Sequence, residues 1–174
     1  LSEYLGEDDY RSGLSRFFDV LFGVPKQGLA KPTSVYVTAG KIYVTLAQSP
    51  AVKIIDPQEK KVTTIGASGK IVLRVPTGVV VSASGIIYVT DSALQRVFGF
   101  DESGISKIAF GNKDLVRPVG LALNHELQRL YVADGADHAI RVYDRRGGKV
   151  FQFGKRARGE GEFNYHTFLT IDRR

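Results

Sequence analysis

The sequence predicts an all-β fold built from repeated four-stranded antiparallel units. Three observations predict it, and each recurs at a spacing of about 42 to 45 residues. The sequence Ile-Tyr-Val-Thr or Leu-Tyr-Val-Ala occurs at 42–45, 87–90 and 130–133. A repeat of this length indicates one supersecondary unit that buries its apolar face only by stacking on its neighbours. An aspartate follows each tyrosine by 13 positions and a glycine follows it by 23 positions, namely Asp56, Asp101 and Asp144, and then Gly66, Gly111 and Gly154.

Each repeat contains four short stretches in which apolar and polar residues alternate, as expected for half-buried β-strands. Four strands in about 43 residues, rich in β-branched and aromatic side chains, are typical of one blade of a β-propeller. Helical repeats of similar length require a 3.6-residue period, which none of the three units shows. The sequence therefore predicts part of a β-propeller, with strands at 35–38, 41–45, 52–56 and 61–66, then 78–82, 86–90, 96–100 and 106–110, then 120–124, 129–133, 140–143 and 148–153.

The predicted propeller is incomplete. Complete blades are expected at 31–66, 75–111 and 117–154, followed by the start of a fourth blade at 162–174. A six-bladed parent propeller needs about 260 residues, since each blade takes about 43. An open stack leaves an uncovered blade face and a bare sheet edge. We therefore expect the remaining blades to come from a longer parent protein or from a second copy of the chain.

Residues 1–30 lie outside the repeat and form a separate N-terminal extension. A short helix is predicted there, capped by Ser12 or Ser15 and ended by Gly23 and Pro25. We expect an apolar plug on the propeller, with a lid or a partner-binding element as the alternative. The helix would line one side with apolar residues, namely Leu14, Phe17, Phe18, Leu21 and Phe22.

The second and third repeats, 76–111 and 118–154, resemble the NHL repeat. Both contain Pro-x-Gly ahead of alternating apolar residues, then Tyr-Val-x-Asp, then Arg-Val ahead of an aromatic-Asp pair, and a terminal Phe-Gly. The first repeat matches less well, because it lacks the aspartate and carries Lys53 where the others carry Arg96 and Arg141. Residues 159–167 resemble the linker into a further repeat, with His166 in the place of the proline. The resemblance implies the propeller fold. Because rigid blades that hold variable loops suit recognition without chemistry, we expect a non-catalytic propeller that binds or scaffolds a protein partner.

The opening of the chain resembles that of exported bacterial NHL-repeat proteins. It contains Glu-Tyr-Leu-Gly at 3–6, Phe-Phe-Asp at 17–19 and Leu-Phe-Gly at 21–23. Members of that group are often lipoproteins, and some accompany multihaem cytochromes. The resemblance implies an extracytoplasmic location, in the periplasm or as an outer-membrane lipoprotein, with a multihaem cytochrome or another envelope protein as the partner. The absence of cysteine fits this location and also a reducing compartment, so the cytoplasm is left open.

Two aspartates occupy matching positions after the second predicted strand of their repeats. These are Asp91 and Asp134, and Arg96 and Arg141 open the strand that follows. The spacing predicts a buried contact of each aspartate with the backbone or with the arginine, repeated from blade to blade. Such a contact is architectural before it is catalytic. In the first repeat Leu46 and Lys53 stand at these positions, so no such contact is expected there.

Basic residues are concentrated near the C-terminus. Residues 141–174 carry nine lysines and arginines against four acidic residues, so they contribute most of the formal charge of +6. Some NHL propellers bind single-stranded RNA through a positive face with aromatic platforms. We therefore treat one basic and aromatic set as a surface for a partner, with nucleic acid as the less favoured ligand: Lys155, Arg156, Arg158, Tyr165 and His166.

Catalysis by a metal is the alternative class of function. Some six-bladed propellers of the lactonase and lyase type bind a metal through side chains that converge on the axis. Here His125 and His138 are predicted at opposite ends of a blade, and only His166 near the fourth blade could join an axial site. The sequence contains no nucleophile elbow, Gly-x-Gly-x-x-Gly motif after a strand or Walker loop. We predict a binding protein without a cofactor, and without a transmembrane segment because no apolar run approaches 20 residues.

Overall fold

The computed structural model describes residues 31–154 and 168–171, and these residues form twelve strands in three sheets. They contain no helix, and so none that would span a bilayer. The predicted N-terminal helix lies outside the described residues. Of the predicted fourth blade the structure describes 168–171, which form no strand.

Each repeat forms one four-stranded antiparallel sheet, as predicted. Strands follow one another in sequence order within each sheet, so every blade is a simple meander. Blade 1 contains β1 (Pro32–Thr38), β2 (Lys41–Leu46), β3 (Ala51–Asp56) and β4 (Lys61–Ile65). Blade 2 contains β5 (Pro76–Val81), β6 (Ile87–Asp91), β7 (Arg96–Phe100) and β8 (Ser106–Phe110). Blade 3 contains β9 (Pro118–Asn124), β10 (Arg129–Asp134), β11 (Ala139–Asp144) and β12 (Lys149–Phe153).

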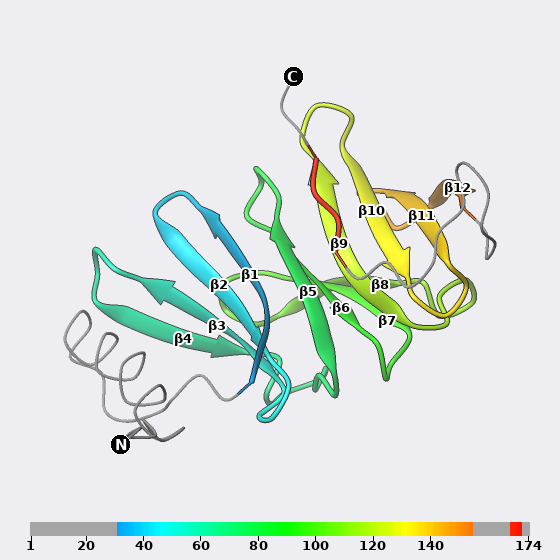
Figure 1. Ribbon diagram of the computed structural model, residues 1–174. Coiled ribbons are helices and arrows are strands. Elements are labelled where there is room, and N and C mark those ends of the chain that lie inside the picture. Colours follow the sequence, from blue (N-terminus) through cyan, green and yellow to red (C-terminus); the bar gives the residue numbers. More distant parts are fainter. Residues whose placement is uncertain (1–30, 155–167, 172–174) are drawn as a thin grey trace, which may run out of the picture.

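The three blades fan outward from their first strands. Figure 1 shows β1, β5 and β9 side by side near the centre of the view, and these inner strands contact one another in that order. The outer strands β4 and β12 lie at opposite margins of the view. This is the arrangement of propeller blades about an axis, in which the first strand of each blade is innermost.

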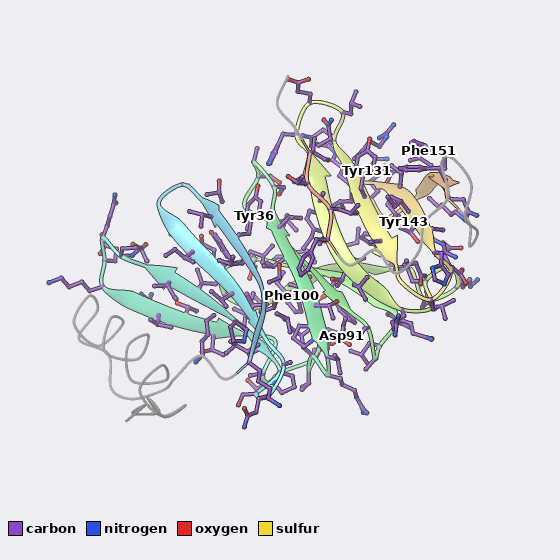
Figure 2. The ribbon with its side chains drawn as sticks, viewed as in Figure 1. Tyr36, Asp91, Phe100, Tyr131, Tyr143 and Phe151 are labelled. Carbon is purple, nitrogen blue, oxygen red and sulfur yellow. The ribbon has the colours of Figure 1, made fainter. Side chains whose placement is uncertain are left out.

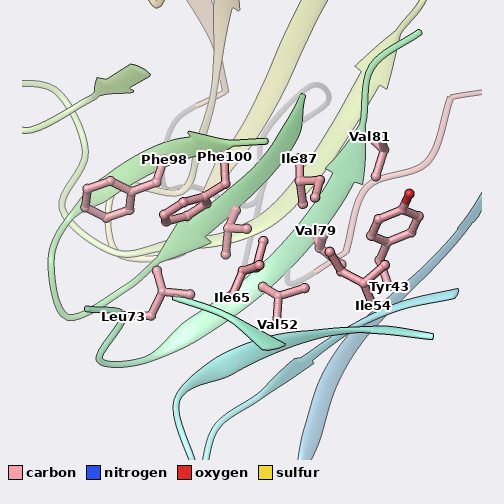
Figure 3. Close-up of a cluster of buried hydrophobic side chains, with 11 residues drawn as sticks. Tyr43, Val52, Ile54, Ile65, Leu73, Val79, Val81, Ile87, Phe98 and Phe100 are labelled. Carbon is pink, nitrogen blue, oxygen red and sulfur yellow. The ribbon is translucent and has the colours of Figure 1, made fainter. Parts of the chain in front are cut away.

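The hydrophobic core lies between the blades. One cluster joins blade 1 to blade 2 and includes Tyr43, Val52 and Phe98, as Figure 3 shows. A second cluster joins blade 2 to blade 3 and includes Tyr88 and Tyr143. Burying one such large apolar side chain contributes about 1.5 to 3 kcal/mol, so face-to-face stacking supplies most of the stability. Successive residues of a strand point to opposite faces of its sheet, so the period-two pattern of the sequence assigns each side chain to one of these two faces.

Threonine hydroxyls connect the inner strands of neighbouring blades. The hydroxyl of Thr33 donates to the carbonyl oxygen of Pro76 at 2.8 Å, and that of Thr77 donates to the carbonyl oxygen of Pro118 at 3.0 Å. The strands approach closely here, because a Cβ built on Gly78 would lie 3.2 Å from the Cβ of Leu121. The starts of the three inner strands are therefore held together directly.

The repeated tyrosine reaches from each blade to a turn of the next. The hydroxyl of Tyr43 lies 3.5 Å from Oε1 of Glu102, and that of Tyr88 donates to the carbonyl oxygen of Arg145 at 3.3 Å. Both acceptors belong to the turn between the third and fourth strands of the following blade. The turn glycine Gly147 has a positive φ and leaves no room for a Cβ, because Phe110 of the preceding blade lies against it.

Among the described residues, no further blade packs on the corresponding face of blade 3. Ile65 and Phe110, which end the outer strands of blades 1 and 2, are 3% and 7% exposed, whereas Phe153 in blade 3 is 42% exposed. Figure 2 shows Tyr131 and Phe151 on blade 3, and Phe151 stacks on Phe153 with ring centroids 6.1 Å apart. This face carries the side chains that meet a following blade at the two earlier junctions.

The first strand of blade 1 also presents unburied junction residues. Val35 pairs with Val44 in the register that Val79 and Leu121 occupy in their own blades. Val35 is 64% exposed, whereas Val79 is 2% and Leu121 is 7% exposed against the preceding blade. The inner edge of blade 1 therefore retains the apolar surface of a blade junction.

One contact joins blade 1 directly to blade 3. The hydroxyl of Tyr36 on β1 lies 3.3 Å from Nε2 of His125, in the turn between β9 and β10. The Tyr36 ring also packs against both core clusters. It thus crosses the inner strand of blade 2 on the concave side of the array.

Candidate binding surface at the inner-strand rim

Asp91 fastens the linker that leads into blade 2. It ends β6 and is fully buried. Its Oδ2 accepts the backbone N–H groups of Arg74 at 2.6 Å and Val75 at 3.1 Å. Its Oδ1 accepts those of Ala93 and Leu94 at 3.1 and 3.0 Å, which forms the Asx turn after β6. One carboxylate therefore holds both the linker and the turn.

Asp134 makes the same set of contacts in blade 3. It is also fully buried, and it accepts the backbone N–H groups of Val116 at 2.7 Å and Arg117 at 3.0 Å. The turn amides of Ala136 and Asp137 complete the set at 3.2 and 3.4 Å. We call Asp91 and Asp134 with their amide donors the carboxylate clamps. Buried carboxylates tolerate this environment because charge-assisted hydrogen bonds replace their water.

The two arginines of the sequence analysis do not occupy equivalent positions, contrary to our expectation. Arg141 donates from Nη1 to Oδ2 of Asp134 at 2.7 Å and from Nη2 to Asp137. Arg96 instead stands opposite Asp91 in the ladder, where Ala139 stands opposite Asp134, and no ion pair of Arg96 occurs among the described residues. The shared Arg-Val pair is offset by two residues. A two-residue shift preserves the strand period, so the pattern does not reveal it.

Blade 1 lacks the carboxylate clamp, as its sequence predicts. Leu46 stands in the aspartate's place and is buried in a small cluster with Val44 and Ile55. The backbone bond from Ala47 N to Lys31 O, at 3.0 Å, still ties β2 to the start of β1. Equivalent bonds in the other blades run to the carbonyl oxygens of Val75 and Arg117.

Cationic and apolar side chains surround the starts of the inner strands. We call this set the inner-strand rim, and its members are all exposed. Val75 and Val116 are 39% and 45% exposed, which is high for valine. The threonine bonds between neighbouring inner strands place these residues together, since each lies within three residues of such a bond. The rim consists of Lys31, Arg74, Val75, Val116 and Arg117.

The rim has an excess of positive charge. Asp91 and Asp134 lie beneath it without solvent exposure, and Arg141 is shared between Asp134 and Asp137, whose side chain is 43% exposed. Nη2 of Arg117 donates to the carbonyl oxygen of Gly135 at 3.3 Å, which orients the guanidinium along the rim. The rim is thus a preorganised surface whose fixed backbone presents Arg and Val side chains to solvent.

The described histidines lie apart, as predicted. His125 belongs to the β9–β10 turn and contacts Tyr36, whereas His138 is buried in the β10–β11 loop at the other end of the blade. Within residues 31–154 and 168–171, no three His, Cys, Asp or Glu side chains are grouped as a metal site would require. The predicted C-terminal surface lies outside the described residues, namely Lys155, Arg156, Arg158, Tyr165 and His166.

The repeat pattern of the sequence did not predict several residues that shape the rim. The recurring Pro-Thr pair, at Pro32 and Pro76, was the available signal for the threonine bonds between blades. Arg74 and Arg117 gave a weaker signal, because they differ by one position relative to the following proline.

Comparisons with known proteins agree with the fold. No family model matches the chain, and no curated protein sequence matches it. Hydrazine synthase of Kuenenia stuttgartiensis is 18% identical with a TM-score of 0.64, over 80% of this chain and 38% of that chain. Virginiamycin B lyase of Staphylococcus aureus is 14% identical with a TM-score of 0.65, over 84% and 47%. A chain of a nidogen/laminin complex is 20% identical with a TM-score of 0.60, over 70% and 48%.

The chain spans less than half the length of each of these solved structures. At this level of identity the likeness concerns the fold alone, and the similar proteins are β-propellers. Three meander sheets, stacked face to face with their first strands innermost, lead to the same conclusion independently. The chain therefore comprises three consecutive blades of a β-propeller.

Proposed function

We propose that this chain is the non-catalytic, protein-binding part of an NHL-type propeller, and that the inner-strand rim is its contact surface. The observation that carries the proposal is the pair of carboxylate clamps at Asp91 and Asp134. The oxygens of both carboxylates accept hydrogen bonds from backbone amides, so the two residues hold the linkers rather than transfer protons. The linkers so held expose Arg and Val side chains, which suit contact with a protein.

Rigid blades that hold exposed linkers favour recognition, since ordering costs are met in the free protein. One solved structure with a similar fold is a nidogen/laminin complex, in which the propeller belongs to a protein assembly. The partner proposed here, from the resemblance of the N-terminal residues, is a multihaem cytochrome or another envelope protein. The proposed location is extracytoplasmic.

A random peptide display library tests the proposal directly. Immobilised chain should enrich peptides whose binding is lost in the Arg74→Gln/Arg117→Gln variant. The Arg145→Gln/Arg146→Gln variant is the matched control, because it removes two exposed arginines from a turn at the opposite end of blade 3. Enrichment that is equal on all three proteins, or absent on all three, would refute the proposal.

Catalysis by a metal is the competing class, since virginiamycin B lyase has a similar fold. Metal analysis of the full-length protein separates the two classes. A stoichiometric metal that is held through dialysis would favour an enzyme whose ligands come from further blades. A metal-free protein that still selects rim-dependent peptides would favour the binding protein.

A further inference from the structure

We infer that the inner-strand rim binds an acidic peptide segment that also carries apolar side chains. This inference rests on the proposed protein-binding function and names the chemistry of the partner. It is carried by the arrangement of cations and valines around the starts of β1, β5 and β9.

Positive charge lies just before each inner strand. Each blade contributes one exposed cation just before its inner strand, namely Lys31, Arg74 and Arg117. The bonds from Thr33 to Pro76 and from Thr77 to Pro118 hold these three strand starts in one row. Three cations from sequence positions far apart are thereby brought to the starts of neighbouring strands, where their potentials add.

The negative charges near the rim already have partners. Asp91 and Asp134 lie beneath the rim, and their oxygens accept hydrogen bonds from backbone amides and from Arg141. The more exposed Asp137 in the turn after Asp134 is paired with the same Arg141. In the linker before Arg117, the charges of Lys113 and Asp114 offset each other. The solvent-facing charge of the rim itself is positive, so the complementary ligand is an anion.

The exposed valines beside the arginines indicate which kind of anion fits the rim. Val75 takes the position in blade 2 that Arg117 takes in blade 3, and Val116 takes that of Arg74. Each of these blades thus exposes one arginine and one valine in reversed order. A nucleic acid would leave the valines without apolar partners unless aromatic platforms stacked its bases, and no rim residue is aromatic. A peptide with Glu and Leu side chains satisfies both kinds of residue.

The carboxylate clamps make the backbone of the rim rigid. The clamps fix the backbone N–H groups of Arg74, Val75, Val116 and Arg117, which are the rim residues of blades 2 and 3. A peptide therefore meets a surface whose backbone is already ordered, and only the long side chains lose freedom on binding.

The test uses the chain as it exists and four fluorescent probes. The probe with the required chemistry is a nine-residue peptide of alternating Glu-Leu-Glu and Ser-Leu-Glu units. Comparison probes replace every Glu with Gln, or every Leu with Ser, and the fourth is a single-stranded oligo(U). Affinities are measured by fluorescence anisotropy at 50 and 300 mM salt, with the folding of each variant checked by circular dichroism.

We expect the Glu-Leu peptide to bind about tenfold more tightly than either substituted peptide, since each removes one of two kinds of contact. Arg74→Gln/Arg117→Gln should weaken its binding about tenfold and reduce the salt dependence. Arg145→Gln/Arg146→Gln, at the opposite end, should leave both unchanged. Equal weakening by the two double variants, equal affinity for the Gln peptide, no binding of the Glu-Leu peptide, or tighter binding of oligo(U) would each overturn the inference.

The two proposals fail in different ways. If the display library yields rim-dependent peptides without acidic residues, the binding function stands and the acidic chemistry is wrong. If no rim-dependent peptide of any composition is recovered, the binding function itself is wrong.

Discussion

Replacing Asp91 with Asn changes one oxygen of a carboxylate into an amide nitrogen and keeps the size of the side chain. Oδ2 receives the amides of Arg74 and Val75, while Oδ1 receives those of Ala93 and Leu94 and also accepts that of Val75 at 3.2 Å. Asparagine retains an acceptor at only one of these two positions. With its oxygen in place of Oδ1, its NH2 group faces the amide of Arg74, which loses its acceptor in a buried site.

The expected cost follows from at least one lost bond. A hydrogen bond to a charged acceptor contributes about 1.5 to 3 kcal/mol, so we expect a loss of about 1.5 to 3 kcal/mol in the free energy of unfolding. Asp56→Asn is the matched control. Asp56 is half-buried and accepts two turn amides through Oδ1, while its Oδ2 lies 3.9 Å from Nζ of Lys41. Asparagine forms the same turn and loses only this long ion pair, so a loss below about 1 kcal/mol is expected.

Urea unfolding followed by far-ultraviolet circular dichroism measures both variants, with the slope of the transition held as a check on two-state behaviour. Hydrogen exchange of the Arg74 and Val75 amides gives a local readout, because these two groups lose protection if Asp91 holds them. A loss below 1 kcal/mol for Asp91→Asn, with unchanged protection of both amides, would show that the clamp does not hold the linker.

Four further substitutions probe the junctions and the titrating groups. Tyr143→Phe removes a buried hydroxyl without a partner, so stability at pH 7 should be unchanged or up to about 1 kcal/mol higher. Burial raises the pKa of Tyr143, so its contribution is present below the ordinary value near pH 10 and is lost as the pH rises; urea titrations at pH 7 and 10.5 should show less alkaline destabilisation in the variant. Phe110→Ala should cost about 3 to 5 kcal/mol and Phe153→Ala about 1 kcal/mol in the same assay, because only Phe110 is covered by a following blade. The hydrogen bond from Lys107 lowers the pKa of Asp101, so its contribution is present above about pH 4 and lost on acidification; Asp101→Asn should flatten the acid limb of the stability curve, and an unchanged limb would contradict this.

The strands were predictable because successive side chains of a strand point to opposite faces of its sheet. On β8 the side chains of Ile108 and Phe110 alternate with the exposed Lys107 and Ala109, and the repeated tyrosines align the three units. The position of Asp91 and Asp134 was equally visible, since a buried acidic residue after an apolar strand requires a partner. These features depend on local pattern, which a single repeat already contains.

The rim was not predictable from the same pattern. Arg74 and Arg117 lie on linkers, where no periodicity constrains the sequence, and only the fold brings them near Lys31. The contact of Tyr36 with His125 joins residues of blades 1 and 3, so no comparison of neighbouring repeats reveals it. The two-residue offset between Arg96 and Arg141 was not predicted, because a shift by two residues keeps a side chain on the same face of the strand.

The contact between Tyr36 and His125 determines how sharply the array bends. Packed sheets lie about 10 Å apart, so in a straight stack the first and third sheets would be separated by about 20 Å, beyond the reach of a tyrosine. Each blade must therefore be a wedge, thin at the inner strand and thick at the outer one. Gly78 supplies the thin end, where a methyl group would already crowd Leu121, and Phe98 and Phe110 supply the thick end. A larger residue at Gly78 would push the inner strands of blades 2 and 3 apart. The array of blades would then curve less.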